Sequence, residues 1–359
     1  MSAVPAPDGG PDAGAVWHYG DPLGEQRAAG LSAVIVDRSH RATLQLTGTE
    51  RRTWLHSISS QHVSDLPDGA VVENLSLDGQ GRVEDHWLQA QLDGVTIIDT
   101  EPWRAEPLLA YLRKMVFWAD VVVEPTDLAV LSLLGLGVRD QAVLDALGVD
   151  SLPAPSTAAP LAGGGFIRTI GRDEVDLVLP HDTAADWRAK LVAAGVRPAG
   201  VWAYEAHRVA ALRPRLGVDT DERTIPHEVG WIGGPGEGAV HLDKGCYRGQ
   251  ETVARVHNLG KPPRMLVLLH LDGGPDRPAT GDPVLAAGRA VGRLGTVVDH
   301  VDLGPIALAL VKRGLPADIE LTTGGESQVA AAIDPDSLPA VVEVGAGRLA
   351  VERLRGHSR

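Results

Sequence analysis

Short apolar runs alternate with segments of helical spacing over the first third of the chain. In chain order, this pattern predicts strands within 33–46, a helix over 50–60, a hairpin over 71–82, a strand at 95–98, a helix over 107–118 and a strand at 121–123. The turn of the hairpin is Asp78–Gly81. Because a hairpin accompanies the helices, we expect an antiparallel or mixed α+β sheet rather than a doubly wound parallel one.

The composition changes at two places along the chain. Residues 1–25 include many Ala, Pro, Gly and Asp, and they are expected to form a disordered N-terminal segment. The stretch 151–165 is rich in Pro, Ala and Gly, which is typical of a loop or of a linker between subdomains. Strands are predicted within 167–179 and a helix over 183–194.

The pair Pro262–Pro263 marks the clearest domain boundary. Short apolar strands follow it at even spacing, separated by turns rich in Gly and Asp: 265–271, 290–298, 306–311, 320–322 and 329–333. Such spacing is typical of a small β-barrel or sandwich, which we assign to residues 263–359.

Charge and motif content exclude several classes of function. The formal net charge is -14, which disfavours a nucleic acid as a direct partner. No apolar run approaches the ~20 residues that span a bilayer, and the first residues lack the pattern of a secretory signal. The sequence contains no phosphate-binding P-loop, no HExxH pair and no G-x-S-x-G elbow. We therefore expect a cytoplasmic protein without a membrane partner.

The single cysteine, Cys246, lies in an unusual loop. One cysteine excludes an internal disulfide, and it cannot hold an iron–sulfur cluster alone. Lys244 and Arg248 bring two cations close, and a helix is predicted from Gln250 to Asn258. Cations and a helix N-terminus favour the thiolate, so we predict a reactive thiol with a lowered pKa. The alternative is an inert structural cysteine.

A carboxylate interrupts the apolar face of the helix predicted from Val201 to Leu212. Glu205 falls in the middle of that face, and Arg208 lies beside it. Burying an unpaired carboxylate costs several kcal/mol or forces protonation. Glu205 therefore needs a partner, which is either a cation such as Arg208 or a ligand that presents two adjacent N–H donors.

The octet Lys244–Glu251 (KGCYRGQE) closely resembles the signature of YgfZ proteins, which are relatives of the glycine-cleavage T-protein, an aminomethyltransferase. Residues 202–229 resemble the Tyr-Glu-x-x-Arg helix and Pro-containing loop of that family, and residues 47–67 resemble its early helix and loop. The resemblance implies a T-protein-like folate-binding region of two α+β subdomains over 26–262, followed by a C-terminal β-barrel.

The resemblance also implies tetrahydrofolate as the cofactor and assigns roles to candidate residues. Glu205 would contact the pterin ring, and Asp85 would lie beside the folate nitrogen that receives the one-carbon unit. His86 and Asp99 depart from the T-protein pattern, which disfavours transferase chemistry. Further candidates for folate contacts are Tyr204, Arg208, Arg223, Lys244, Arg255, Lys261 and Arg264, although a solvated face explains the basic residues near Cys246 equally well.

Three functions remain open at this point. The leading expectation is a folate-binding accessory protein that supports maturation or repair of iron–sulfur enzymes, including tRNA-modifying ones, with Cys246 acting near the folate pocket. The alternative is a folate-dependent aminomethyltransferase or demethylase. The third is an interaction scaffold with a vestigial pocket.

Overall fold

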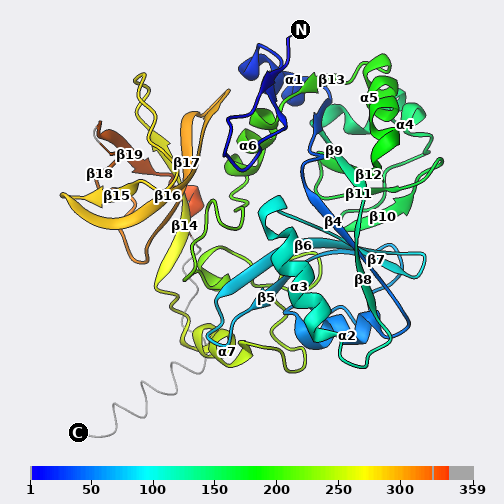
Figure 1. Cartoon of the computed structure of the whole chain (residues 1–359). Helices are drawn as coiled ribbons and strands as arrows, with labels where there is room; N and C mark the ends of the chain where they lie inside the picture. The colour runs from blue at the N-terminus through cyan, green and yellow to red at the C-terminus, as the bar shows by residue number, and fades with distance from the viewer. Residues whose placement is uncertain (1, 326, 339–359) are drawn as a thin grey trace, which may run out of the picture.

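The computed structural model describes residues 2–325 and 327–338, and it contains two large β-sheets and a closed barrel (Figure 1). A small two-stranded sheet, β1–β2, lies near the N-terminus. Short 3-10 helices connect several elements: η1 (Pro102–Arg104), η2 (Leu136–Arg139), η3 (His181–Thr183), η4 (Pro226–Glu228) and η5 (Pro335–Ser337). Within the described residues, no helix is long and apolar enough to cross a membrane.

The first large sheet has five antiparallel strands in the order β5-β6-β7-β4-β8. Its strands are β4 (Ala42–Thr47), β5 (Val71–Leu77), β6 (Val83–Leu92), β7 (Val95–Thr100) and β8 (Val122–Thr126). Helices α2 (Arg51–Ile58) and α3 (Ala105–Met115) cover one face, where Trp54, Leu108 and Leu112 pack with Trp87 of β6. The other face packs on the second sheet, where Val71 and Ala90 lie in one buried cluster with Val130 and Val178.

The second sheet has six strands in the order β10-β11-β12-β9-β3-β13, and only the β13–β3 pair is parallel. Its strands are β3 (Val34–Asp37), β9 (Leu128–Leu134), β10 (Thr157–Pro160), β11 (Phe166–Thr169), β12 (Glu174–Pro180) and β13 (Arg197–Ala199). Helices α4 (Gln141–Leu147) and α5 (Ala184–Ala193) pack on one face of this sheet. The stretch 151–165, expected to be a loop or linker, contains β10 and so belongs to this sheet.

The N-terminal segment is folded, so the expectation of disorder over residues 1–25 is wrong for the described part. Strands β1 (Val4–Pro5) and β2 (Val16–His18) form a hairpin, and helix α1 (Pro22–Leu31) follows. Ala6 and Asp12 are buried, and the Trp17 ring lies 5.4 Å from that of Trp202 in α6 (Val201–Ala210). These anchors follow no helical or strand period, which explains why the sequence pattern did not reveal them.

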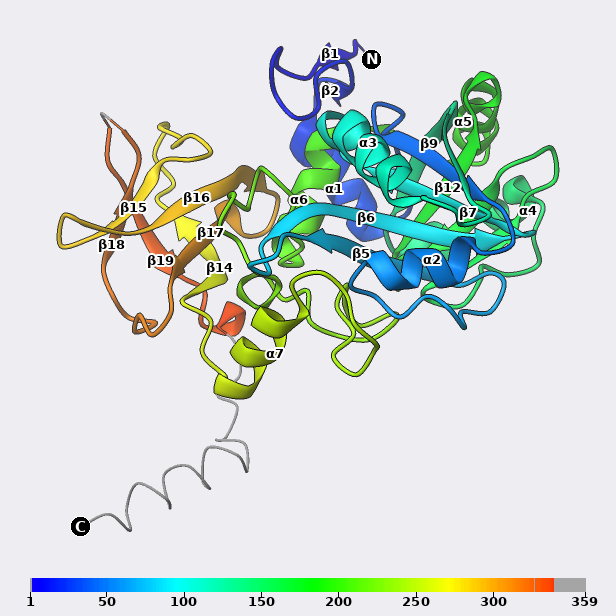
Figure 2. The same ribbon diagram turned by 60° about the horizontal axis from the view of Figure 1, so that its bottom comes forward.

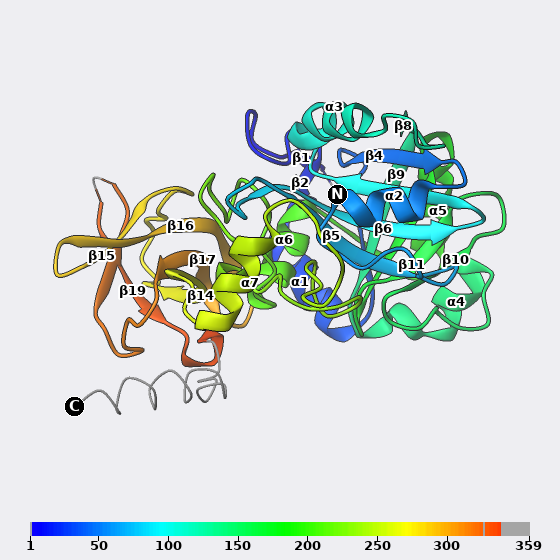
Figure 3. The same cartoon turned by 90° about the horizontal axis from the view of Figure 1, so that it is seen from below.

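The C-terminal strands close into a barrel, as predicted. Its strands are β14 (Arg264–Leu271), β15 (Pro283–Ala286), β16 (Arg289–His300), β17 (Gly304–Lys312), β18 (Leu321–Thr323) and β19 (Val329–Ile333). Helix α6 lies between the barrel and the sheets (Figure 2). Helix α7 (Gln250–Leu259) lies below β14 and β5 in the view of Figure 1 and faces the viewer when the molecule is seen from below (Figure 3). The part of the predicted barrel region over 339–359 is outside the described residues.

Candidate functional site

A cavity of about 250 Å³ lies where the two sheets, α6 and the loop after α6 meet. Six arginines and six acidic residues contribute to its wall, together with the rings of Tyr204, His86 and Trp231. The arginines are Arg38, Arg41, Arg168, Arg208, Arg213 and Arg215, and the acidic residues are Glu73, Asp99, Glu101, Glu174, Asp176 and Glu237. The wall thus combines apolar surface with equal numbers of basic and acidic side chains.

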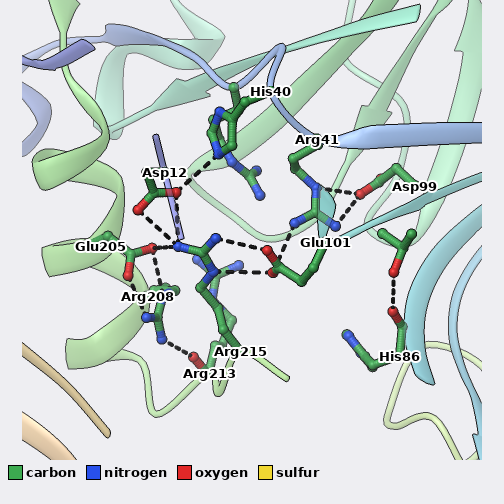
Figure 4. Close-up of polar contacts among 12 residues, drawn as sticks. Asp12, His40, Arg41, His86, Asp99, Glu101, Glu205, Arg208, Arg213 and Arg215 are labelled. Carbon is green, nitrogen blue, oxygen red and sulfur yellow. Dashed lines mark hydrogen bonds and ion pairs between the residues drawn. The ribbon is translucent and has the colours of Figure 1, made fainter. Parts of the chain in front are cut away.

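Arg215 is the centre of one buried ion network (Figure 4). Its Nε and Nη2 donate to Glu101 at 3.1 and 2.8 Å, and its Nη1 donates to Asp12 at 3.0 Å and to Glu205 at 3.1 Å. Burial alone would raise the pKa of Glu101, but Arg215 and Arg41 hold that pKa well below its usual range. The network ties the N-terminal segment, the residue that follows β7, and α6 to one guanidinium.

Glu205 is held by arginines, so its assignment as the carboxylate that contacts the pterin is wrong for this structure. Arg208 Nε donates to Glu205 Oε1 at 2.8 Å, Arg208 Nη2 donates to Oε2, and Arg215 donates to Oε1. Glu205 is not among the described residues that line the cavity. The structure therefore supports the ion-pair alternative. Arg208 does reach the wall, where Asp219 also binds it at 2.8 Å.

A second network closes the wall beside β7 and β11. Arg41 Nε donates to Asp99 at 2.6 Å, and Arg168 contacts both Asp99 and Asp176. Burial would raise the pKa of Asp99, but Arg168 and Arg41 lower it to about 2. Asp99, which departs from the T-protein pattern, is therefore a charged structural partner of arginines.

Tyr204, a candidate for a folate contact, lies in the cavity wall. The Arg38 guanidinium lies 3.7 Å from its ring centroid and that of Arg213 lies 6.0 Å away. Burial is the main cause that raises the pKa of Tyr204 to about 12, so the phenol keeps its proton at neutral pH.

Glu174, at the start of β12, is a wall residue that the sequence analysis missed. Its Oε2 lies 2.5 Å from Arg213 Nη1 and 3.5 Å from His207 Nε2. Burial would raise the pKa of Glu174, but Arg213 and His207 lower it to about 2. The sequence could have revealed Glu174 by its position in a strand of otherwise mostly apolar residues. A buried strand rarely tolerates an unpaired acid, so such a residue is expected to have a partner.

His86, and not Asp85, faces the cavity. Its Nε2 lies 2.9 Å from Glu73 Oε2, and its ring stacks on Trp231 with centroids 4.6 Å apart and planes 7° apart. Successive strand residues point to opposite faces. Asp85 therefore lies on the far face of β6, where Arg104 donates to it at 2.8 Å and Ser76 at 2.7 Å. Asp85 does not line this cavity but lines a second one of about 910 Å³ together with Arg104, so its role beside a folate stays a prediction.

Cys246 is exposed and is not among the described residues that line the cavity. The Lys244 ammonium binds the backbone carbonyls of His56, Ser59 and Gln61, and burial lowers the pKa of Lys244 to about 7. Arg248 pairs with Glu84 at 2.8 Å. Both cations expected to activate the thiol thus have other partners. The expectation that Lys244 binds a ligand and that Cys246 lies near the pocket is not met.

The remaining basic candidates also lie away from the cavity wall. Arg223 and Arg255 are exposed, and so is Lys261. Arg264 is bound by Asp221 and Glu228 at 2.6 and 2.7 Å. Among the described residues, no group of three or more His, Cys, Asp or Glu side chains is arranged to hold a metal ion.

Comparison with solved structures identifies the fold. The chain is similar to the glycine cleavage system aminomethyltransferase T from Bartonella henselae, with a TM-score of 0.80, 19% identity and coverage of 92% of this chain and 93% of that one. The architecture of two α+β subdomains and a closed barrel is therefore that of a T-protein, as predicted.

Sequence comparison agrees with this fold. A protein named as a chloroplastic transferase of Arabidopsis thaliana is 25% identical over 271 residues, covering 73% of this chain and 61% of that protein. The aminomethyltransferase of Nitrosomonas eutropha is 29% identical, covering 59% and 61% respectively, and that of Stenotrophomonas maltophilia is 27% identical, covering 67% and 70%. No family model matches the chain.

Proposed function

We propose that the chain binds a reduced folate, with the pterin ring in the cavity. The observation that carries this proposal is a cavity at the centre of a T-protein fold that combines a flat aromatic wall with buried charged groups. The stacked rings of His86 and Trp231 offer a planar surface, and Tyr204 adds a neutral phenol. The volume of about 250 Å³ lies just below the range of small-molecule pockets, ~300–1,000 Å³. It suits the ring system, while the glutamate tail would extend outside.

The activity that the relatives favour is folate-dependent transfer of a one-carbon unit from an amine, because aminomethyltransferases are the most frequent names among them. A bound reduced folate would supply the nitrogen that accepts the unit. Within the cavity, His86 and Glu73 form a histidine–carboxylate pair, with Nε2 of the histidine 2.9 Å from a carboxylate oxygen. Such a pair is a common arrangement for general acid–base catalysis. We assign His86 the role of general acid–base and Glu73 the role of orienting its ring.

A second candidate rests on the exposed thiol. Cys246 is the only cysteine and is open to solvent, so a partner protein can reach it. A folate-binding accessory protein for iron–sulfur enzymes would use this thiol as one ligand while the client supplies the others. This candidate predicts folate binding without turnover of an amine.

The test uses two adjacent residues on opposite faces of β6. Tetrahydrofolate is titrated into the protein while Trp fluorescence is followed, because Trp231 lies in the cavity wall. Saturable quenching is expected in the wild type and in Asp85→Asn. His86→Asn should retain binding within about tenfold but lose folate-dependent turnover of an aminomethyl donor. Absence of saturable quenching would refute the proposal, and binding without turnover in the wild type would favour the accessory role.

A further inference from the structure

Glu174 and Arg213 form an ion pair in the cavity wall that uses only part of its hydrogen-bonding capacity. Arg213 Nη1 binds Glu174 Oε2, but Glu174 Oε1 and the Nε and Nη2 of Arg213 are buried and have no hydrogen-bond partner among the described residues. The neighbouring pair differs, because Asp176 receives Arg168 Nε at 3.0 Å and Nη2 at 2.7 Å on one oxygen and Ser132 at 2.6 Å on the other. A buried polar atom without a hydrogen-bond partner is destabilising. The unpaired atoms of Glu174 and Arg213 therefore suggest that a ligand supplies their partners.

We propose that Glu174 and Arg213 bind the cis-amide edge of a ring lactam, in which a ring N–H lies next to a carbonyl group. The pair presents an acceptor oxygen beside donor nitrogens, and this edge presents the complementary donor and acceptor. The inference rests on the proposed folate site and identifies the part of the ligand that is read there. The 4-oxopyrimidine ring of a folate has such an edge.

This arrangement discriminates against a 4-amino ring. Replacing the carbonyl by an amino group puts a donor opposite the N–H groups of Arg213, which then remain unpaired. Sites built to pair a polar group reject an analogue that cannot pair by large factors. Glu174 adds to the discrimination, because the neutral 4-amino ring has no N–H beside the substituted carbon and presents an acceptor nitrogen to the carboxylate.

Glu174 and Arg213 are placed so that a ligand in the cavity can contact them. The terminal torsion of a glutamate is broad, so the carboxylate can turn toward the cavity without a backbone shift. The Arg213 guanidinium lies 6.0 Å from the centroid of the Tyr204 ring. Both residues already line the cavity.

The test compares folic acid with its 4-amino analogue, aminopterin, by isothermal titration of the full chain. The wild type should prefer folic acid by on the order of 100-fold. Glu174→Gln and Arg213→Met should each reduce that preference below about tenfold. Glu320→Gln is the matched control, because Glu320 is an exposed acid that does not line the cavity, and it should keep the wild-type preference.

The possible results separate this inference from the proposed function. Equal affinity of the wild type for the two compounds would overturn the lactam assignment and leave folate binding intact, and this result needs no variant to fold. An undiminished preference in both variants would also overturn the assignment. If neither compound nor tetrahydrofolate binds saturably, both proposals fail.

Discussion

Replacing Glu205 by glutamine should destabilise the fold. The carboxylate is 3% exposed and binds Arg208 at 2.8 Å and Arg215 at 3.1 Å. Glutamine keeps the volume but loses the charge, and its amide nitrogen would face guanidinium donors. Removing one partner of a buried pair costs about 3–5 kcal/mol. Arg208 keeps Asp219 and Arg215 keeps Glu101, so we expect a cost at or below the lower limit of that range, about 2–3 kcal/mol.

Urea unfolding followed by circular dichroism measures this change. With a slope of roughly 3 kcal/mol per M, the loss corresponds to a midpoint lower by about 0.7–1 M. The exposed control Glu237→Gln should shift the free energy of unfolding by less than about 0.5 kcal/mol. A double-mutant cycle with Arg208→Met should give a coupling energy above about 1 kcal/mol, because the two side chains touch.

The opposite result would restore the ligand role of Glu205. If Glu205→Gln unfolds at the wild-type urea concentration but binds tetrahydrofolate at least tenfold more weakly, the arginines do not hold this carboxylate in solution. Tenfold corresponds to about 1.4 kcal/mol of binding free energy. The reasoning from the ion pairs would then be wrong.

Three further predictions concern acid stability, the N-terminal segment and the thiol. Arg213 and His207 hold the pKa of Glu174 at about 2 against an ordinary 4.5, so its stabilisation is present above pH 4.5 and lost as the pH falls toward 2. Glu174→Gln should therefore lose less stability than the wild type over that range. Curves of unfolding free energy against pH that run parallel for the two proteins would contradict this. Asp12→Ala should speed amide exchange over 7–18, whereas Asp8→Ala, at an exposed position, should not; equal exchange would show that Asp12 is no anchor. Cys246 should react with one equivalent of a thiol reagent without denaturant, and Cys246→Ser should bind tetrahydrofolate within twofold of the wild type; a larger loss would place the loop in the site.

The sequence was sufficient to predict most elements, because their apolar spacing is regular. The helices over 50–60, 107–118, 183–194 and 201–212 all form, and so does the barrel. Helix α1 was missed because it follows a segment expected to be disordered. Its buried residues include Glu25 and Gln26, which an apolar pattern does not detect.

The site was harder to predict, because its residues come from separate elements. Arg38 follows β3, Glu174 begins β12 and Arg213 follows α6, and only the sheet packing brings them to one wall. To decide whether Asp85 or His86 faces the cavity, one must know which face of β6 lies toward it. The alternation of side chains along the strand does not give this information. Likewise, a carboxylate in an apolar helix face requires a partner but does not identify which partner it has.

The buried charges at this cavity divide into two kinds, and the division decides what each substitution should change. Buried ion pairs give little net stability compared with apolar side chains of the same size. A gain in stability therefore does not explain why this cavity contains so many of them. Glu205, Arg208 and Arg215 satisfy one another and fix the position of α6 against the N-terminal segment, so their loss should appear first in unfolding. Glu174 and Arg213 keep unpaired atoms at the cavity, so their loss should appear first in the choice of ligand. A substitution of Glu205 that changes ligand choice without changing stability would contradict this division directly.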